Sequence, residues 1–176
     1  GKGSGEHCGV LDKVDIISST FGKALGGASG GFISASKNIV DTLRQKSRPY
    51  LFSNSLAPAL VVACLKAIDI INKNKNLIVK LHDNTTYFRD QIKEIGYEVK
   101  GDSHPIVPIM IYDAKQAVAL SEMLLEENIY VIPFSFPVVP KGQARIRVQL
   151  SSSHTKEQLQ HSIRAFKECG KALNII

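Results

Sequence analysis

The sequence has few cysteines, and the three that it has form no recognisable pattern. Cys8, Cys64 and Cys169 are odd in number and widely spaced, without a Cys-x-x-Cys pair or a Cys/His combination at metal-ligand spacing. This usage argues against a structural zinc site and favours a reducing compartment. Cys64 lies in an apolar helical pattern, so we expect it to be a core residue.

Long apolar runs, repeats and low-complexity segments are also lacking. The longest apolar stretches are too short to span a bilayer, and no signal or transit peptide is visible. Aromatic residues make up 7% of the chain and are not interleaved with basic residues as on a nucleic-acid surface. We therefore expect no membrane or nucleic-acid partner, and we interpret the net charge of +6 as a solvated, lysine-rich surface.

One glycine-rich loop around a lysine is the most informative segment. A strand-like run at residues 14–19 leads into Thr20-Phe-Gly-Lys-Ala-Leu-Gly-Gly-Ala-Ser-Gly-Gly31. A lysine that holds pyridoxal phosphate as a Schiff base needs an amine at the end of a rigid strand, a nearby hydroxyl for the phosphate, and backbone able to approach the cofactor. Lys23, Thr20 and the glycines meet these needs.

Each of these residues also has a simpler interpretation. Lys23 could be a solvated loop lysine, and Thr20 could cap the turn after a strand. Gly26, Gly27, Gly30 and Gly31 could cradle a phosphate, but we favour a role in a tight crossover between strands. The five histidines have no acid or nucleophile partner at a telling spacing, so we assign them no catalytic role.

Two further segments extend the pattern over the whole chain. They are Arg48-Pro-Tyr-Leu-Phe-Ser-Asn-Ser-Leu-Ala-Pro58 and Pro137-Val-Val-Pro-Lys-Gly-Gln-Ala-Arg-Ile-Arg147. With the lysine loop, they resemble the α-oxoamine synthases, which are fold-type-I pyridoxal phosphate enzymes with the aminotransferase class I/II fold. Among these, the glycine C-acetyltransferases, also called 2-amino-3-ketobutyrate coenzyme A ligases, are the most similar branch.

The resemblance implies a role for each candidate site residue. Lys23 would hold the cofactor and remove the Cα proton of the amino acid, and Thr20 would contact the cofactor phosphate. Ser53 and Asn54 would reach the phosphate of the other subunit's cofactor, which implies an obligate homodimer with shared active sites. From chemistry alone, N-capping of the helix that follows is an equal alternative for this pair.

The strand at residues 145–150 carries the last candidate. Its alternation places Arg145, Arg147 and Gln149 on one face, and a guanidinium can grip a carboxylate with two parallel bonds. The resemblance assigns the substrate carboxylate to Arg147 and leaves Arg145 as a structural residue. Without the resemblance, both arginines would be interpreted as a solvated strand face.

The resemblance implies an acyltransferase that condenses glycine with acetyl-CoA to give 2-amino-3-ketobutyrate and coenzyme A, with threonine dehydrogenase as a possible supplier. It implies a mitochondrial location in a eukaryote and a cytoplasmic one otherwise. The alternatives are a relative with another amino acid or acyl-CoA, an inactive fragment that only dimerises, and a phosphate-binding module. In the family, other cofactor ligands lie upstream of the position matching Gly1, so we expect this chain to be the C-terminal part of a longer enzyme. We expect this part alone to bind the cofactor poorly and to expose an apolar face.

The periodicity predicts an α/β fold with two domains. Residues 1–71 are expected to be the end of a large, parallel α/β cofactor domain, and residues 72–176 a small α+β domain. In the first, we expect buried strands at 14–19 and 31–35, a helix at 38–46, an extended segment at 50–53, and a buried bridging helix at 57–71. In the second, we expect helices at 77–95, 114–127 and after the capping box Thr155-Lys-Glu-Gln158, with strands at 97–99, 106–111, 130–133 and 145–150.

Overall fold

The computed structural model describes residues 3–26 and 29–176. It divides into two compact units, Gly1–Lys75 and Asn76–Ile176. The division lies at the end of the polar run 72–76, four residues after the predicted boundary. Within the described residues, no helix has the length and apolarity required to cross a membrane.

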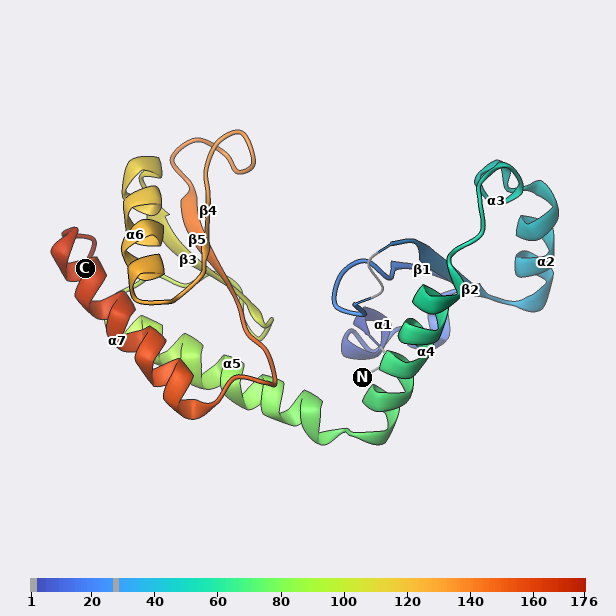
Figure 1. Ribbon diagram of the computed structural model, residues 1–176, viewed down its shortest axis with the longest axis horizontal. Helices are drawn as coiled ribbons and strands as arrows, with labels where there is room; N and C mark the ends of the chain where they lie inside the picture. Colours follow the sequence, from blue (N-terminus) through green and yellow to red (C-terminus); the bar gives the residue numbers. More distant parts are fainter. Residues whose placement is uncertain (1–2, 27–28) are drawn as a thin grey trace. The chain divides into compact units, whose positions relative to one another are not determined.

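Unit 1 consists of a two-stranded sheet with helices before and after it in the chain (Figure 1). Its elements are α1 (Ser4–His7), the 3-10 helix η1 (Leu11–Lys13), β1 (Ile16–Thr20), β2 (Gly31–Ala35), α2 (Lys37–Lys46), α3 (Arg48–Phe52) and α4 (Pro58–Lys73). The strands and the helices α2 and α4 are where the sequence predicts them.

The two strands pair antiparallel, from Ile16 opposite Ala35 to Thr20 opposite Gly31, although the sequence places them at the end of a parallel α/β domain. The physical reason is the connection, because residues 21–30 are too few for the crossover that parallel neighbours require. Phe21 and Phe32 stack beside the end of the pair with ring centroids 5.3 Å apart.

The predicted burial of β1 and α4 is wrong for this chain, whereas the expected exposed apolar face is present. All five residues of β1 are exposed, and in α4 only Cys64 is buried. Large apolar side chains of α4 remain open to solvent, with Val62 at 64% and Leu65 at 62% exposure. The apolar pattern predicts that other elements cover β1 and α4, but no layer of described residues in this unit covers them. The core position of Cys64 is confirmed at 2% exposure.

The segment predicted to be extended at residues 50–53 is instead the short helix α3, with Ser53 as its extended C-cap. Pro49 lies in the first turn of this helix, where its missing N–H has no intrahelical partner to lose and its fixed φ suits the helix. The proline therefore starts a helix here instead of preceding an extended segment.

Unit 2 is a three-stranded antiparallel sheet with helices packed against it (Figure 1). Its elements are α5 (Asn76–Glu94), β3 (Ile106–Tyr112), α6 (Ala114–Glu126), β4 (Ile132–Phe134), β5 (Ala144–Gln149) and α7 (Lys156–Ala172). The strand order is β3-β5-β4, so the last strand lies in the centre. The predicted strand at 97–99 is reduced to a single bridge between Val99 and Ile109.

The core of unit 2 lies between the sheet and the helices. Phe88 of α5 and Phe166 of α7 are almost fully buried and meet edge to face, with ring centroids 6.3 Å apart. Ile109 and Ile146 face them from the sheet with no exposed surface. The predicted capping box is confirmed, because the Thr155 side chain accepts from Gln158 N and the Gln158 side chain accepts from Thr155 N.

Candidate active site

Thr20 and Lys23 line one open hollow in unit 1, together with Ser18, Ser19, Ala24 and Leu25. Thr20 is the last residue of β1, and Lys23 follows in a turn that Gly26 N closes by donating to Lys23 O at 2.9 Å. At the base of the loop, Phe21 N donates to Gly30 O at 2.9 Å. The structure therefore places an exposed lysine and an exposed threonine along the same hollow at the end of a strand.

Two glycines at the base of this loop allow close packing. A Cβ on Gly31 would lie 2.5 Å from Ser19 O, within the facing strand. A Cβ on Gly30, whose φ of +82° is in the left-handed region, would lie 2.3 Å from Leu56 Cδ2. The predicted involvement of Gly27 lies outside the described residues.

Ser53 and Asn54 lie in the connection between α3 and α4, and both are exposed. The N-cap of α4 is Ala57, and no side-chain hydrogen bond caps this helix. The N-capping interpretation of the pair is therefore wrong. Neither residue lines the hollow beside Lys23, and in the described part of the chain their side chains form no hydrogen bond.

Arg147 lies on the central strand β5 of unit 2, opposite Ile132. The predicted alternation is confirmed, since Ile146 is buried, Arg147 and Gln149 are exposed, and Arg145 is half-buried. The Cζ atom of Arg147 lies 4.3 Å from the ring centroid of Phe134. Arg147 forms no ion pair with any described residue, so its N–H groups are available to an anion.

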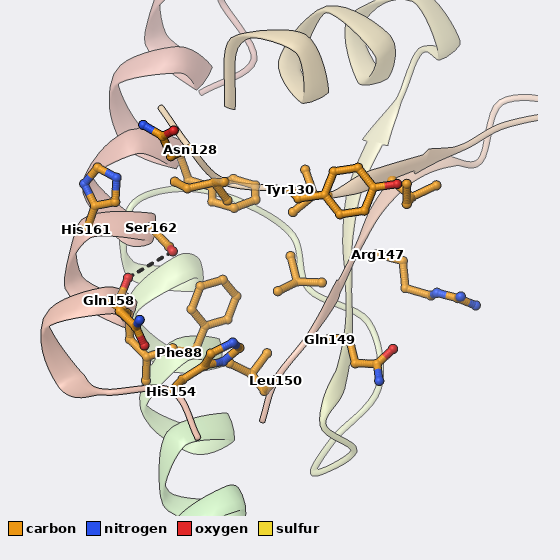
Figure 2. A pocket seen from close by; sticks show the side chains of 16 residues that line it. Phe88, Asn128, Tyr130, Arg147, Gln149, Leu150, His154, Gln158, His161 and Ser162 are labelled. Atoms are coloured by element: carbon orange, nitrogen blue, oxygen red, sulfur yellow. Dashed lines mark hydrogen bonds between the residues drawn. The ribbon is translucent and has the colours of Figure 1, made fainter. Parts of the chain in front are cut away.

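Arg147 also borders a cavity of about 420 Å³ between β5 and α7, whose walls include Phe88, Leu150 and His154. Figure 2 shows the side chains of Arg147 and Gln149 pointing away from Phe88 and His154. The histidines that line this cavity interact with backbone atoms. His154 Nδ1 accepts from Ser151 N at 3.2 Å, and His161 Nε2 lies 2.9 Å from Glu127 O.

The three cysteines are free thiols in the structure. Cys8 is exposed, whereas Cys64 and Cys169 are buried, and burial is the main cause that raises the pKa of the Cys169 thiol. Because the thiolate is the reactive form of cysteine, this environment suits a packing role for Cys169.

The candidate residues fall in both units. Thr20, Lys23, Ser53 and Asn54 belong to unit 1, and Arg147 belongs to unit 2. The structure brings together Thr20 and Lys23. The sequence did not identify Phe134 as a neighbour of Arg147. Phe134 lies two residues after Ile132, which is the partner of Arg147 on the neighbouring strand, so an alignment of the two strands could have found it.

The sequence matches a known family over most of its length. The family model of aminotransferase class I and II covers residues 2–166. The chain belongs to the aminotransferase class I and II family.

Several members of this aminotransferase family are close relatives of the chain. The 2-amino-3-ketobutyrate coenzyme A ligase of Escherichia coli K12 is 49% identical over 176 residues, which are 100% of this chain and 44% of the relative. The human protein named 2-amino-3-ketobutyrate coenzyme A ligase, mitochondrial, is 46% identical over 97% of this chain and 41% of its own. The 8-amino-7-oxononanoate synthase of Petrotoga mobilis is 43% identical over 100% of this chain and 44% of its own.

Solved structures of the family have the same fold. Serine palmitoyltransferase of Sphingomonas wittichii aligns with a TM-score of 0.94 at 30% identity, over 100% of this chain and 44% of that one. A high-resolution structure of SPT with a PLP internal aldimine aligns with a TM-score of 0.92 at 26% identity, over 98% of this chain and 44% of that one. The predicted α/β fold of fold-type-I pyridoxal phosphate transferases and the predicted resemblance are thus confirmed. The chain spans less than half the length of the relatives that it matches.

Proposed function

We propose that this chain forms the part of a pyridoxal phosphate-dependent acyltransferase that carries the cofactor lysine. The enzyme would condense glycine with acetyl-CoA to give 2-amino-3-ketobutyrate and coenzyme A. The observation that carries the proposal is the shared hollow of Thr20 and Lys23 at the end of β1, in a chain 49% identical to a 2-amino-3-ketobutyrate coenzyme A ligase.

The groups around this hollow suit pyridoxal phosphate. Lys23 supplies a primary amine that can bond to the cofactor's carbonyl carbon, and the hydroxyl of Thr20 can donate to a phosphate oxygen. Gly31 lets the backbone of β2 pass close to β1 at this point. When bound, the cofactor supplies an electron sink for the carbanion formed at the amino acid's Cα.

The chain's own residues then have distinct tasks. The Nζ atom of Lys23 first holds the cofactor and later, as a free amine, takes the proton from the Cα of glycine. The guanidinium of Arg147 binds the glycine carboxylate through two N–H groups, because its exposed head has no competing acid among the described residues.

Ser53 and Asn54 complete the proposed assembly. Their exposed hydroxyl and amide, free of the α4 N-cap, would bind the phosphate of the cofactor held by a second subunit. This assignment requires a homodimer with shared active sites. In this enzyme, residues 1–71 would form the C-terminal end of a large cofactor domain, and residues 72–176 would form the small domain. The division into two compact units supports this assignment.

A second candidate is another α-oxoamine synthase, which uses a different amino acid or acyl-CoA. The 43% identity to an 8-amino-7-oxononanoate synthase favours keeping it. A panel of amino acids and acyl-CoA thioesters distinguishes the two, since the leading proposal requires glycine with acetyl-CoA to have the highest kcat/KM. A mitochondrial location, as in the names of the mammalian relatives, is part of the proposal for a eukaryotic source.

Borohydride trapping tests the cofactor lysine directly. Because the chain alone is expected to bind the cofactor poorly, the longer enzyme that would contain it is incubated with pyridoxal phosphate and reduced, and the labelled peptide is mapped by mass spectrometry. We expect one dominant label at Lys23, its loss in Lys23→Ala, and its retention in Lys46→Ala, which removes an exposed lysine from the end of α2. Scattered labelling, or equal labelling in Lys23→Ala, would contradict the assignment.

A further inference from the structure

The guanidinium of Arg147 rests on an aromatic ring. Its Cζ atom lies 4.3 Å from the ring centroid of Phe134, which is well within the range of a cation–π contact. Arg147 is exposed, whereas Phe134 is half-buried. The ring is therefore the more fixed partner, and it can restrict where the arginine head lies.

The strand register explains why these two side chains meet. Arg147 of β5 lies opposite Ile132 of β4, and Phe134 lies opposite Arg145. Side chains two residues apart on one strand share a face, so Phe134 is the diagonal neighbour of Arg147 on the same face of the sheet. A diagonal neighbour lies within reach of a long side chain and an aromatic ring. The contact thus follows from backbone pairing.

The two arginines of this face differ in what holds them. The Nε atom of Arg145 donates to Gln143 O at 3.2 Å, so part of its hydrogen-bonding capacity is committed to its own chain. Arg147 has the ring of Phe134 below it and no described acid beside it. A ring below a guanidinium takes none of its N–H groups, because these lie in the plane of the guanidinium.

We propose that Phe134 is a positioning residue that orients the guanidinium of Arg147 for the carboxylate of the amino-acid substrate. This inference rests on the proposed function, in which Arg147 binds that carboxylate. An exposed arginine samples many rotamers, and fixing it on binding costs conformational entropy. A ring that already restricts the arginine lowers this cost and leaves both N–H groups of the fork directed outward.

Nuclear magnetic resonance of the intact chain tests the contact without any enzymatic assay. Above a ring face, the Nε–Hε and side-chain protons of Arg147 shift upfield. We expect Phe134→Leu to remove this shift, Phe134→Tyr to retain it, and Phe136→Leu to leave it unchanged. Phe136 is a matched control because it is 60% exposed and its ring contacts Lys141. Arg147 resonances that are the same in Phe134→Leu and wild type would overturn the proposal.

Steady-state kinetics with glycine then separates positioning from general packing. Loss of a cation–π contact predicts a rise of about three- to tenfold in KM for glycine in Phe134→Leu. The value of kcat and the KM for acetyl-CoA should change little, because carboxylate binding is the same in the ground state and the transition state. Arg147→Gln, which removes the guanidinium itself, should raise the KM for glycine further.

The outcomes distinguish this proposal from the proposed function. If Phe134→Tyr does not rescue the KM for glycine, or if kcat falls as much as KM rises, Phe134 acts through packing and the positioning role is wrong. If the wild-type enzyme does not use glycine, the proposed function fails. The resonance shift of Arg147 and its response to acetate would still show whether Phe134 orients the guanidinium toward a carboxylate.

Discussion

At the scale of single residues, side chains of the same type differ in their environment, and this difference shows which of them can bind a ligand. Arg145 and Arg147 lie two positions apart on the same face of β5, but only Arg147 is exposed and stacked on a ring. His104, His154 and His161 each interact with backbone groups near turns or helix ends, as expected for histidines without a catalytic role. Residue type alone could not have separated these cases.

Tyr97 gives unit 2 a predicted pH dependence. It is buried, its hydroxyl donates to Phe166 O at 2.9 Å, and burial is the main cause that raises its pKa above the ordinary value. The native state therefore keeps the proton at a pH where the unfolded chain has lost it. This contribution to stability is complete below about pH 10, the ordinary tyrosine pKa, and declines as the pH rises toward the native pKa.

Urea unfolding of the wild type and Tyr97→Phe between pH 8 and 11 checks this. At pH 8, Tyr97→Phe should be less stable by about 1 kcal/mol, because the variant lacks one buried hydrogen bond. The difference should shrink as the pH rises above about 10, since phenylalanine does not ionise. Tyr130→Phe, at an exposed position, should show no such trend. A Tyr97→Phe difference that is constant with pH would contradict the assignment.

At the scale of elements, local signals defined the helices of unit 2 well. The apolar period placed α5, α6 and α7, and the capping box marked the start of α7. The same signals failed at α3, where Pro49 begins a short helix. A proline after a polar stretch can begin a helix or precede an extended segment, so the neighbouring sequence could not decide between the two.

Removing the N-cap of α7 should destabilise unit 2. We expect Thr155→Ala to lower the free energy of unfolding by about 1 kcal/mol, because an N–H at the start of the helix loses its acceptor. Thr155→Ser keeps the hydroxyl and should retain most of the stability. The measurement is urea unfolding followed by circular dichroism. If serine and alanine were equally destabilising, the methyl packing of Thr155, and not the cap, would account for the effect.

At the scale of the whole molecule, the buried residues are distributed unequally. Apart from Cys64, all buried hydrophobic residues in the described ranges belong to unit 2, where nearly all of them pack into one cluster. In unit 1, Cys64 is the only buried residue in the ranges 3–26 and 29–75. Unit 2 therefore has the core that an independently folding domain needs, whereas unit 1 buries little apolar surface of its own.

Separate expression of the two units checks this difference. We expect residues 76–176 to unfold cooperatively, with a free energy of unfolding close to that of the same unit in the intact chain. Residues 1–75 should show no cooperative transition and should bind the dye ANS, because large apolar side chains remain exposed. A cooperative thermal transition in the 1–75 fragment would contradict this interpretation.

The sequence by itself determined what depends on near neighbours. The position of Thr20 at the end of a strand, the alternation around Arg147 and the capping box at Thr155 are local patterns, and the structure places them as predicted. The same patterns were sufficient to identify the family, because they are specific in combination and in order.

Only the tertiary structure decided what depends on distant segments. The antiparallel direction of β1 and β2, the exposure of β1 and α4, and the contact of Arg147 with Phe134 all require knowing which segment lies against which. An apolar period shows that a face can be buried, but burial itself depends on whether another element covers that face. Similarly, alternation assigns Arg147 to a face, and the register with β4 places a ring beneath it.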